Sequence, residues 1–208
     1  MSQAARRLFS VEEYVALEEA AEYKSEYFRG EIFAMAGGLP EHNLICLNVG
    51  AELRHQLAAG PCRVYGGDQR VKVSETGLYT YPDVTVVCEE PLVDEIDRSA
   101  LVNPVLIVEV LSEGTEAYDR GDKFGYYREL LTLQEYVMVG SDQWRVERYT
   151  RQAPGADWLM SECSDIEGTL ALPSIGCLLE LRGVYAKVEL PPRQFGRRRR
   201  RVRVTRLA

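Results

Sequence analysis

The sequence has no long hydrophobic run and few of the patterns that build metal knuckles or disulfide frameworks. No apolar stretch approaches the ~20 residues that a membrane-spanning helix needs, and the N-terminal "MSQAARRLFS" lacks the apolar segment of a secretory signal. The five cysteines are odd in number, far apart and include no Cys-x-x-Cys. We therefore expect a cytoplasmic protein whose cysteines are free thiols, mostly buried as small core residues.

Length and charge indicate one folded body with a basic extension. The 208 residues, 46% of them hydrophobic, supply enough material for one ordinary core and too little for two. The last sixteen residues hold eight arginines and no acid, so residues 1–192 carry 17 basic and 32 acidic side chains, a net charge of −15. We predict one domain over residues 1–190 and a disordered, Arg-rich tail at 191–208. So acidic a body repels nucleic acid unless metal ions or a local basic groove compensate.

Helices and strands are expected to mix without internal repeats and without strict βαβ alternation. Helix patterns occur at 9–19, 40–59 and 118–131, and Ser10 with Glu13 forms a capping box at the first of them. The acidic stretch 89–103 has no clear period and is expected to be a solvated loop. Strand patterns occur at 31–36, 62–66, 69–75, 81–88, 104–112, 134–140, 144–150 and 158–163. The pattern predicts an α/β fold of the mixed α+β type, a central mixed sheet flanked by helices.

One glutamate lies inside the apolar strand pattern "PVLIVEVLS", where an unpaired carboxylate would be costly to bury. If this strand is an antiparallel neighbour of "YPDVTVVC", with Asp83 opposite Glu109, the numbers of paired residues sum to 192 and the pairing fits both strand ends. The two carboxylates would then lie side by side on one face. Either one of them is protonated or a hard divalent cation lies between them.

A lysine is expected beside this pair. Taking Lys123, Tyr127 and Leu130 as i, i+4 and i+7 places Lys123 on the helix stripe that faces the sheet, with Asp119 as a possible N-cap. An inward lysine beside two carboxylates can hold a phosphate or orient an attacking water. Asp, Glu and Lys around an oxygen-rich centre are typical of metal-assisted phosphodiester hydrolysis.

The segments "YPDVTVVC", "NPVLIVEVLS", "YDRGDKFGYYREL" and "LQEYVMV", in this order, resemble the Uma-type restriction endonuclease family, a branch of the PD-(D/E)XK nuclease superfamily. The resemblance covers about residues 9–190. It implies a restriction-endonuclease-like core and a DNA endonuclease that depends on magnesium or manganese. It also implies a homodimer, because such sites often cut two strands with two subunits.

The resemblance also assigns roles to residues. It makes Asp83 and Glu109 metal ligands, with the backbone carbonyl of Val110 as a third, and it matches Glu26 to an extra N-terminal acid that binds metal or water. Where the superfamily has a lysine two residues after the acid, this chain has Leu111. The resemblance then makes Lys123 the substitute, with Lys72 as its rival.

Other interpretations stay open at this point. Asp83 after Pro82 could cap a turn, and Glu109 could form a purely structural ion pair with Lys123. His42, one of two histidines, could face the site or cap its helix. The chain could also be a nucleic-acid-binding module that has lost catalysis, or a non-catalytic protein-interaction domain. RNA is not excluded as a substrate.

Overall fold

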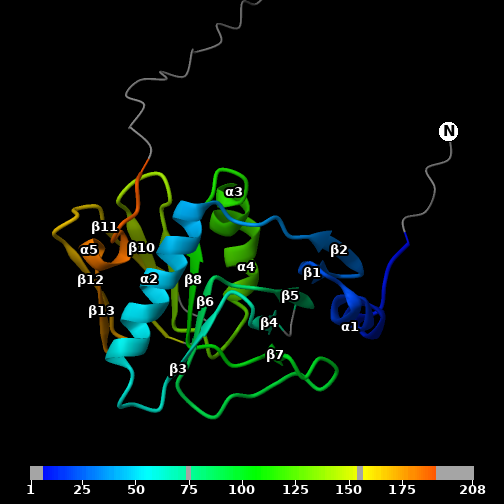
Figure 1. Ribbon diagram of the computed structural model, residues 1–208. Coiled ribbons are helices and arrows are strands. Elements are labelled where there is room, and N and C mark those ends of the chain that lie inside the picture. The colour runs from blue at the N-terminus through cyan, green and yellow to red at the C-terminus, as the bar shows by residue number, and fades with distance from the viewer. Residues whose placement is uncertain (1–6, 74–75, 154–156, 191–208) are drawn as a thin grey trace, which may run out of the picture.

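The structure, a computed structural model, describes residues 7–73, 76–153 and 157–190 (Figure 1). The predicted tail at 191–208 lies outside the described residues. Within the described ranges, no helix has both the length and the apolar character needed to cross a bilayer. The helical segments are α1 (Val11–Ala20), α2 (Pro40–Gln56), α3 (Glu116–Tyr118), the π-helical turn η1 (Asp119–Lys123), α4 (Phe124–Tyr127) and α5 (Leu181–Val184).

A six-stranded sheet forms the centre of the molecule and carries most of the expected strands. Its order is β11-β10-β9-β8-β6-β3, and only β8 and β9 run parallel. The predicted mixed sheet is thus confirmed. The strands are β3 (Arg63–Gly66), β6 (Val84–Val87), β8 (Leu106–Val110), β9 (Glu135–Val139), β10 (Val146–Arg151) and β11 (Trp158–Cys163).

The predicted register between β6 and β8 is confirmed. Val84 pairs with Val108 and Val86 pairs with Leu106 in an antiparallel ladder, so partner numbers sum to 192. Continued by one residue, this register places Asp83 opposite Glu109. The two acids therefore lie where β6 begins and β8 ends.

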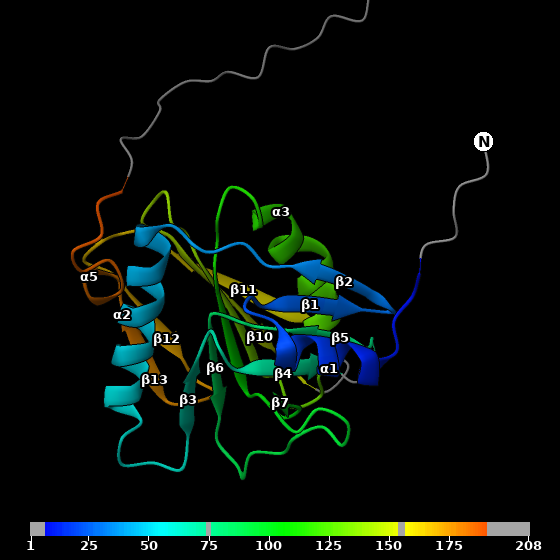
Figure 2. The same cartoon turned by 45° about the vertical axis from the view of Figure 1, so that its right-hand side comes forward.

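The two faces of this sheet pack against different partners. Along β8, Leu106, Val108 and Val110 join the core under α2, whereas Ile107 joins the core on the side of α4. Glu109 follows the same alternation and points to the α4 side. In Figures 1 and 2, α2 crosses one face of the sheet, beside β12 (Thr169–Leu172), β13 (Cys177–Glu180) and α5.

A second, five-stranded sheet has the order β2-β1-β5-β4-β7 and packs near α1 (Figure 2). The capping box of Ser10 and Glu13 starts α1 as predicted. Glu26, expected on or just after the first helix, lies on the strand β1, where it pairs with Phe33 of β2. Its neighbours Ser25 and Tyr27 are buried. The strands are β1 (Ser25–Phe28), β2 (Glu31–Ala34), β4 (Arg70–Val73), β5 (Leu78–Thr80) and β7 (Ala100–Leu101).

The third helix starts earlier than the sequence indicates. It begins at Glu116, so Asp119 is not an N-cap but lies inside the helical segment, at the start of the π-helical turn, and is buried. The helical region also ends at Tyr127 rather than at 131. A π turn holds one residue more than an α turn and is frequent at functional sites.

The segment 89–103 is not simply a solvated loop. Asp94 and Asp97 are buried and form ion pairs with Lys72 and Arg70 of β4. The strand β7 at Ala100–Leu101 adds the segment to the five-stranded sheet. Its acids serve to neutralise buried cations, which a count of charges along the sequence cannot reveal.

The expectation of free thiols is wrong for two of the cysteines. Cys62 and Cys88 form a disulfide, while Cys46, Cys163 and Cys177 are free. The ladder between β3 and β6 pairs Arg63 with Val87, and one step further along it Cys62 lies opposite Cys88. The strand register therefore explains the bond, although the cysteine spacing in the sequence does not suggest it.

Candidate active site

The carboxylate of Glu109 is buried at the end of β8, where two donors from other residues approach it. The residue is 4% exposed, and its Oε1 accepts a hydrogen bond from the Tyr127 hydroxyl at 2.7 Å. The ammonium of Lys123 lies 2.9 Å from the same oxygen. Burial, opposed by the charge of Lys123, raises the pKa of Glu109 to about 8. Without a cation, this site therefore holds a proton more readily than an ordinary glutamate does.

Lys123 points toward the sheet, as the helical spacing predicts, and is 5% exposed. Its Nζ lies 2.9 Å from Glu109, 3.4 Å from Glu26 and 3.5 Å from Asp119. Burial lowers the pKa of Lys123, but the three carboxylates outweigh it and hold that pKa above its ordinary value. Lys123 is therefore a fixed positive charge at the centre of an acidic cluster.

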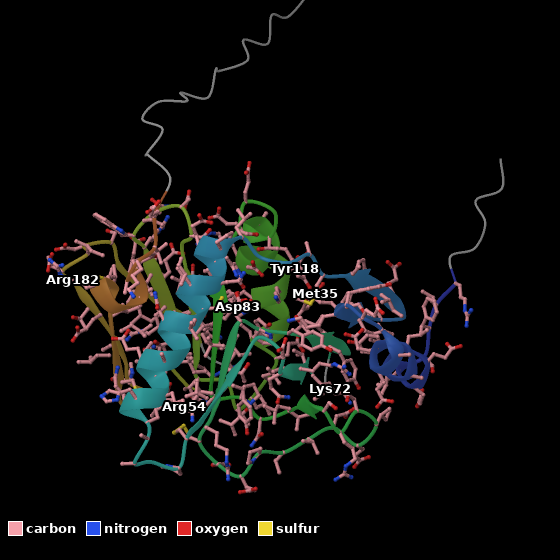
Figure 3. All side chains as sticks on the ribbon, in the orientation of Figure 1. Met35, Arg54, Lys72, Asp83, Tyr118 and Arg182 are labelled. Atoms are coloured by element: carbon pink, nitrogen blue, oxygen red, sulfur yellow. A yellow bond between two sulfur atoms is a disulfide. The ribbon has the colours of Figure 1, made fainter. Side chains whose placement is uncertain are left out.

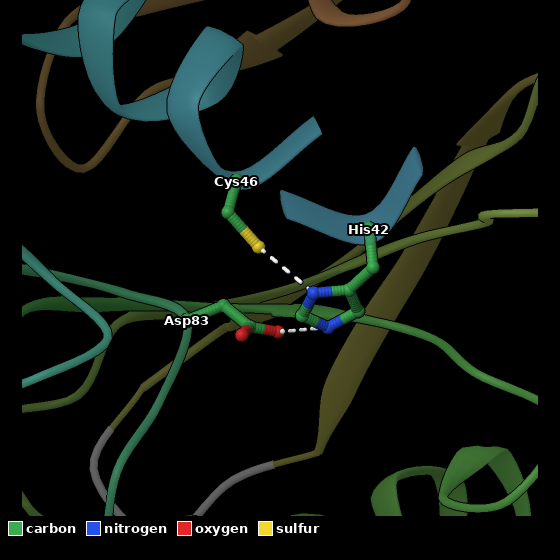
Figure 4. Close-up of side chains that lie close together, drawn as sticks. All are labelled: His42, Cys46 and Asp83. Atoms are coloured by element: carbon green, nitrogen blue, oxygen red, sulfur yellow. Dashed lines mark hydrogen bonds and ion pairs between the residues drawn. The ribbon is translucent and has the colours of Figure 1, made fainter. Parts of the chain in front are cut away.

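Asp83 lies between β8 and α2 (Figures 3 and 4). Its Oδ2 accepts a hydrogen bond from the N–H of Val110 at 2.7 Å and lies 3.3 Å from Nε2 of His42. The Asp83 side chain keeps 20% of its surface exposed. The hydrogen bond to Asp83, partly opposed by burial, raises the pKa of His42 above its usual value. The Asp83 side chain is thus more exposed than those of Glu26, Glu109 and Asp119.

The structure adds residues that the sequence analysis did not assign to the site. Asp119 is 3% exposed, and burial raises the pKa of its carboxyl. The hydroxyl of Thr80 donates to Glu26, and Tyr127 donates to Glu109. The spacing of Asp119 and Lys123, i and i+4, was the available signal for Asp119. A helix that starts at Asp119 makes this residue an N-cap instead, whereas the helix in the structure starts at Glu116.

Lys72, the rival to Lys123, belongs to another part of the fold. It lies on β4, forms an ion pair with Asp94 and stands well apart from Asp83 in Figure 3. Lys72 therefore neutralises the charge of Asp94 in the segment 89–103. Lys123 is the lysine that lies beside Glu109.

The donor set of this site suits a hard divalent cation. Three carboxylates, of Glu26, Glu109 and Asp119, lie within 3.5 Å of the ammonium of Lys123, and the charge of Asp83 also acts on Glu109. Such an excess of buried negative charge is costly unless protons or a cation offset it. Carboxylate oxygens are the ligands that Mg²⁺ and Mn²⁺ prefer. The residues present therefore fit the cation that the sequence pattern implies.

The fold is shared with a solved structure. A crystal structure from Anabaena variabilis, described as "a putative nuclease belonging to DUF820", superposes with a TM-score of 0.68. The two chains are 17% identical, and the match covers 85% of this chain and 97% of that chain. The predicted mixed α+β fold is thus that of a known structure.

Sequence relatives and a family model cover most of the chain. The "Uncharacterized protein slr1290" of Synechocystis sp. is 37% identical over 178 residues, which are 85% of this chain and 90% of the relative. The "Uncharacterized protein sll1609" of the same organism is 35% identical over 162 residues, 78% of this chain and 91% of the relative. The family model described as "Putative restriction endonuclease" matches residues 11–182. The chain therefore belongs to the Uma2 family of restriction-endonuclease-like proteins.

Proposed function

We propose that the protein is a DNA endonuclease that hydrolyses phosphodiester bonds with Mg²⁺ or Mn²⁺. The observation that carries this proposal is the cluster of three carboxylates around Lys123, with Asp83 at the start of β6 opposite Glu109 at the end of β8. A structural ion pair needs one acid for one base, whereas this cluster has an excess of acids. That excess supports a site built to receive a cation.

Asp83 and Glu109 are the proposed ligands, with the carbonyl oxygen of Val110 as the third. When bound, the cation would polarise a phosphoryl oxygen and lower the pKa of a water molecule. The N–H of Val110 fixes the Asp83 carboxylate, and the Tyr127 hydroxyl fixes that of Glu109. Both ligands are thus preorganised by groups on β8 and α4, which lowers the cost of assembling the site.

Lys123 and Glu26 have supporting roles in this proposal. The ammonium of Lys123 is held in place by three carboxylates and would stabilise the negative charge that develops on the phosphate. Glu26, whose side chain is 12% exposed, accepts from Thr80 and would orient the attacking water or bind the cation. Glu26 comes from the second sheet, so the proposed site needs both sheets in place.

The substrate and the assembly rest on the family. Its description as a restriction endonuclease supports double-stranded DNA as the substrate and a homodimer that cuts both strands. The net charge of −7 means that DNA must meet a local positive or metal-neutralised surface on this protein. RNA is the alternative substrate that the same active-site chemistry would accept.

A non-catalytic function has one specific observation in its favour. Oε1 of Glu109 already meets both Lys123 and Tyr127, so this carboxylate is satisfied without a metal. In that case the cluster would only stabilise the contact between the two sheets and α4. Such a domain would bind a protein or nucleic acid without cutting it.

Cleavage assays separate the two functions. Supercoiled, linear and single-stranded DNA, and RNA, are incubated with the full chain in Mg²⁺, Mn²⁺ or EDTA. The wild type is compared with Asp83→Asn, Glu109→Gln and Lys123→Met, with Lys72→Met as the matched lysine control. We expect metal-dependent cleavage that the first three variants lose and the control keeps.

Calorimetric titration with Mn²⁺ provides a second readout. The nuclease proposal requires Mn²⁺ binding that Asp83→Asn and Glu109→Gln weaken. No cleavage of any substrate, together with no Mn²⁺ binding to the wild type, would overturn the proposal and leave the structural interpretation.

A further inference from the structure

Beside the oxygen-rich cluster lies a second group of donors with a different chemistry. His42 and Cys46 are i and i+4 on α2, so both side chains leave the same face of that helix. Asp83 approaches them from the start of β6 (Figure 4). One ligand atom from each of the three residues can be chosen so that all lie within 4.8 Å of one another.

Cys46 and Asp83 contact the two different nitrogens of the His42 ring. The Sγ of Cys46 lies 3.5 Å from Nδ1 of His42, and Oδ2 of Asp83 lies 3.3 Å from Nε2 of the same ring. Around a tetrahedral Zn²⁺ with bonds of ~2.0–2.3 Å, neighbouring ligand atoms stand about 3.3–3.8 Å apart. An ion binds only one nitrogen of an imidazole, so the ring of His42 would have to turn until one nitrogen faces both Cys46 and Asp83. The ligand atoms that now lie within 4.8 Å of one another would then approach these separations.

An ion can reach these residues from solvent. The side chains of His42 and Asp83 are 18% and 20% exposed, and Cys46 is half-buried. The buried carboxylates of Glu109 and Asp119 lie behind Asp83 and add negative charge to the surroundings. The place is thus open to a small cation, and its charge attracts one.

The donor atoms select the metal. Nitrogen and sulfur ligands favour Zn²⁺ and similar transition-metal ions, whereas Mg²⁺ prefers sites made of oxygen alone. Three protein ligands and one open position are typical of zinc sites that exchange their ion or a bound water. His42 and Cys46 would therefore bind an ion that the oxygen cluster does not favour.

We propose that His42, Cys46 and Asp83 form a Zn²⁺-class site, and that an ion bound there inhibits the nuclease by occupying the carboxylate of Asp83, which already lies beside His42. As the sulfur binds the ion, the thiol proton of Cys46 leaves to solvent, and no electrons are transferred. The inhibition rests on the function proposed above, whereas the binding site itself does not. The same aspartate thus belongs to both proposed centres, and an ion at one would compete for it with an ion at the other.

Binding is tested with Co²⁺, whose bond to a thiolate gives a charge-transfer absorption band. Full-length protein is titrated with Co²⁺ without reductant, so that Cys62 and Cys88 stay bonded to each other. We expect a band that Zn²⁺ abolishes by competition and that Cys46→Ser lacks. Cys163→Ser, which removes another free thiol, is the matched control and keeps the band.

His42→Gln is a second test of the site, needed in case the Cys46→Ser protein does not fold. This variant leaves the thiol of Cys46 in place. We expect it to weaken Co²⁺ binding by about tenfold or more, because it removes one of three ligands. Absence of the band in the wild type would overturn the site. A band that survives in Cys46→Ser would also overturn it.

Inhibition is tested by measuring the rate of DNA cleavage at constant Mg²⁺. For each variant, the rate with Zn²⁺ is divided by the rate without Zn²⁺. The ratio should fall in the wild type and in Cys163→Ser, and stay near one in Cys46→Ser. A band without inhibition would leave the metal site standing and overturn its regulatory role. Absence of cleavage at any metal concentration would instead overturn the proposed nuclease function, and with it the inhibition, while the Co²⁺ titration still decides the site.

Discussion

The ammonium of Lys123 lies 2.9 Å from Oε1 of Glu109, and both side chains are almost completely buried. The pair connects the central sheet to the π-helical turn, and through Glu26 it reaches the second sheet as well. Two charges can be this deeply buried only because each is surrounded by groups of opposite sign or by hydrogen-bond partners. The same contacts make the pair a sensitive point for stability, metal binding and pH.

Lys123→Met should destabilise the protein by about 3–5 kcal/mol, because three carboxylates lose their shared cation. Urea unfolding followed by circular dichroism measures the change. Lys24→Met is the control, because the Lys24 side chain is 43% exposed in its pair with Asp68. This substitution should lower the free energy of unfolding by about 1 kcal/mol or less. Equal costs for the two variants would contradict the central role of Lys123.

The metal-free protein should lose stability as pH rises between about 4.5 and 8. Glu109 has its pKa raised from 4.5 to about 8, mainly by burial, so the folded protein holds a proton that the unfolded chain releases. Stability from this group is present below pH 4.5 and is lost through pH 8, at up to about 1.4 kcal/mol per pH unit. Asp119, whose pKa burial also raises, acts in the same direction.

Glu109→Gln isolates this contribution. Unfolding free energies in EDTA, measured at several pH values, should give a flatter slope for Glu109→Gln than for the wild type. A raised pKa of Lys123 does not interfere, because its contribution changes only above the ordinary lysine pKa. Identical slopes would mean that Glu109 titrates normally in the folded protein.

Mn²⁺ should stabilise the wild type and not Asp83→Asn. A ligand that binds only the folded state at about 100 times its Kd adds about 2.7 kcal/mol of stability. Asparagine keeps an oxygen that can accept from the N–H of Val110, so the fold should survive while the charge is lost. Thermal unfolding with and without Mn²⁺ measures the difference. A similar Mn²⁺ shift in both proteins would remove Asp83 from the ligand set.

Replacing both Cys62 and Cys88 by serine should cost about 3 kcal/mol, since the bond closes a loop with a sequence separation of 26 residues. Urea unfolding of this double variant in EDTA checks the value, with Cys163→Ser as the single-thiol control. Mn²⁺ binding should be unchanged, because the bond joins the ends of β3 and β6 that lie away from Asp83. A large loss of Mn²⁺ affinity would show that the strand ends are coupled.

The sequence was sufficient for features that depend on local pattern and strand pairing. The register that brings Asp83 to Glu109, the capping box at Ser10 and the inward position of Lys123 all follow from periodicity and spacing. These patterns are local or involve only two strands. They therefore needed no knowledge of how the sheets pack.

Features that depend on packing between distant segments were missed or misplaced. Asp119 becomes part of the site only because the helix starts at Glu116 and continues through a π turn. The strands β5, β12 and β13 pair with neighbours close in sequence, but each has only three or four residues, too few for a clear strand pattern. The ion pair of Lys72 becomes evident only once Asp94 is placed.

The antiparallel pairing of β6 and β8 has a consequence for how such a site varies between proteins. The chain between the two strands, residues 88–105, connects them at the end opposite to Asp83 and Glu109. Residues can thus be added to or removed from the exposed parts of this connection without moving either carboxylate, provided that the ladder keeps its register and Asp94 and Asp97 keep their ion pairs. The distance between the two acids along the chain is therefore free to change, and a search for a fixed interval would overlook relatives whose sites have the same geometry.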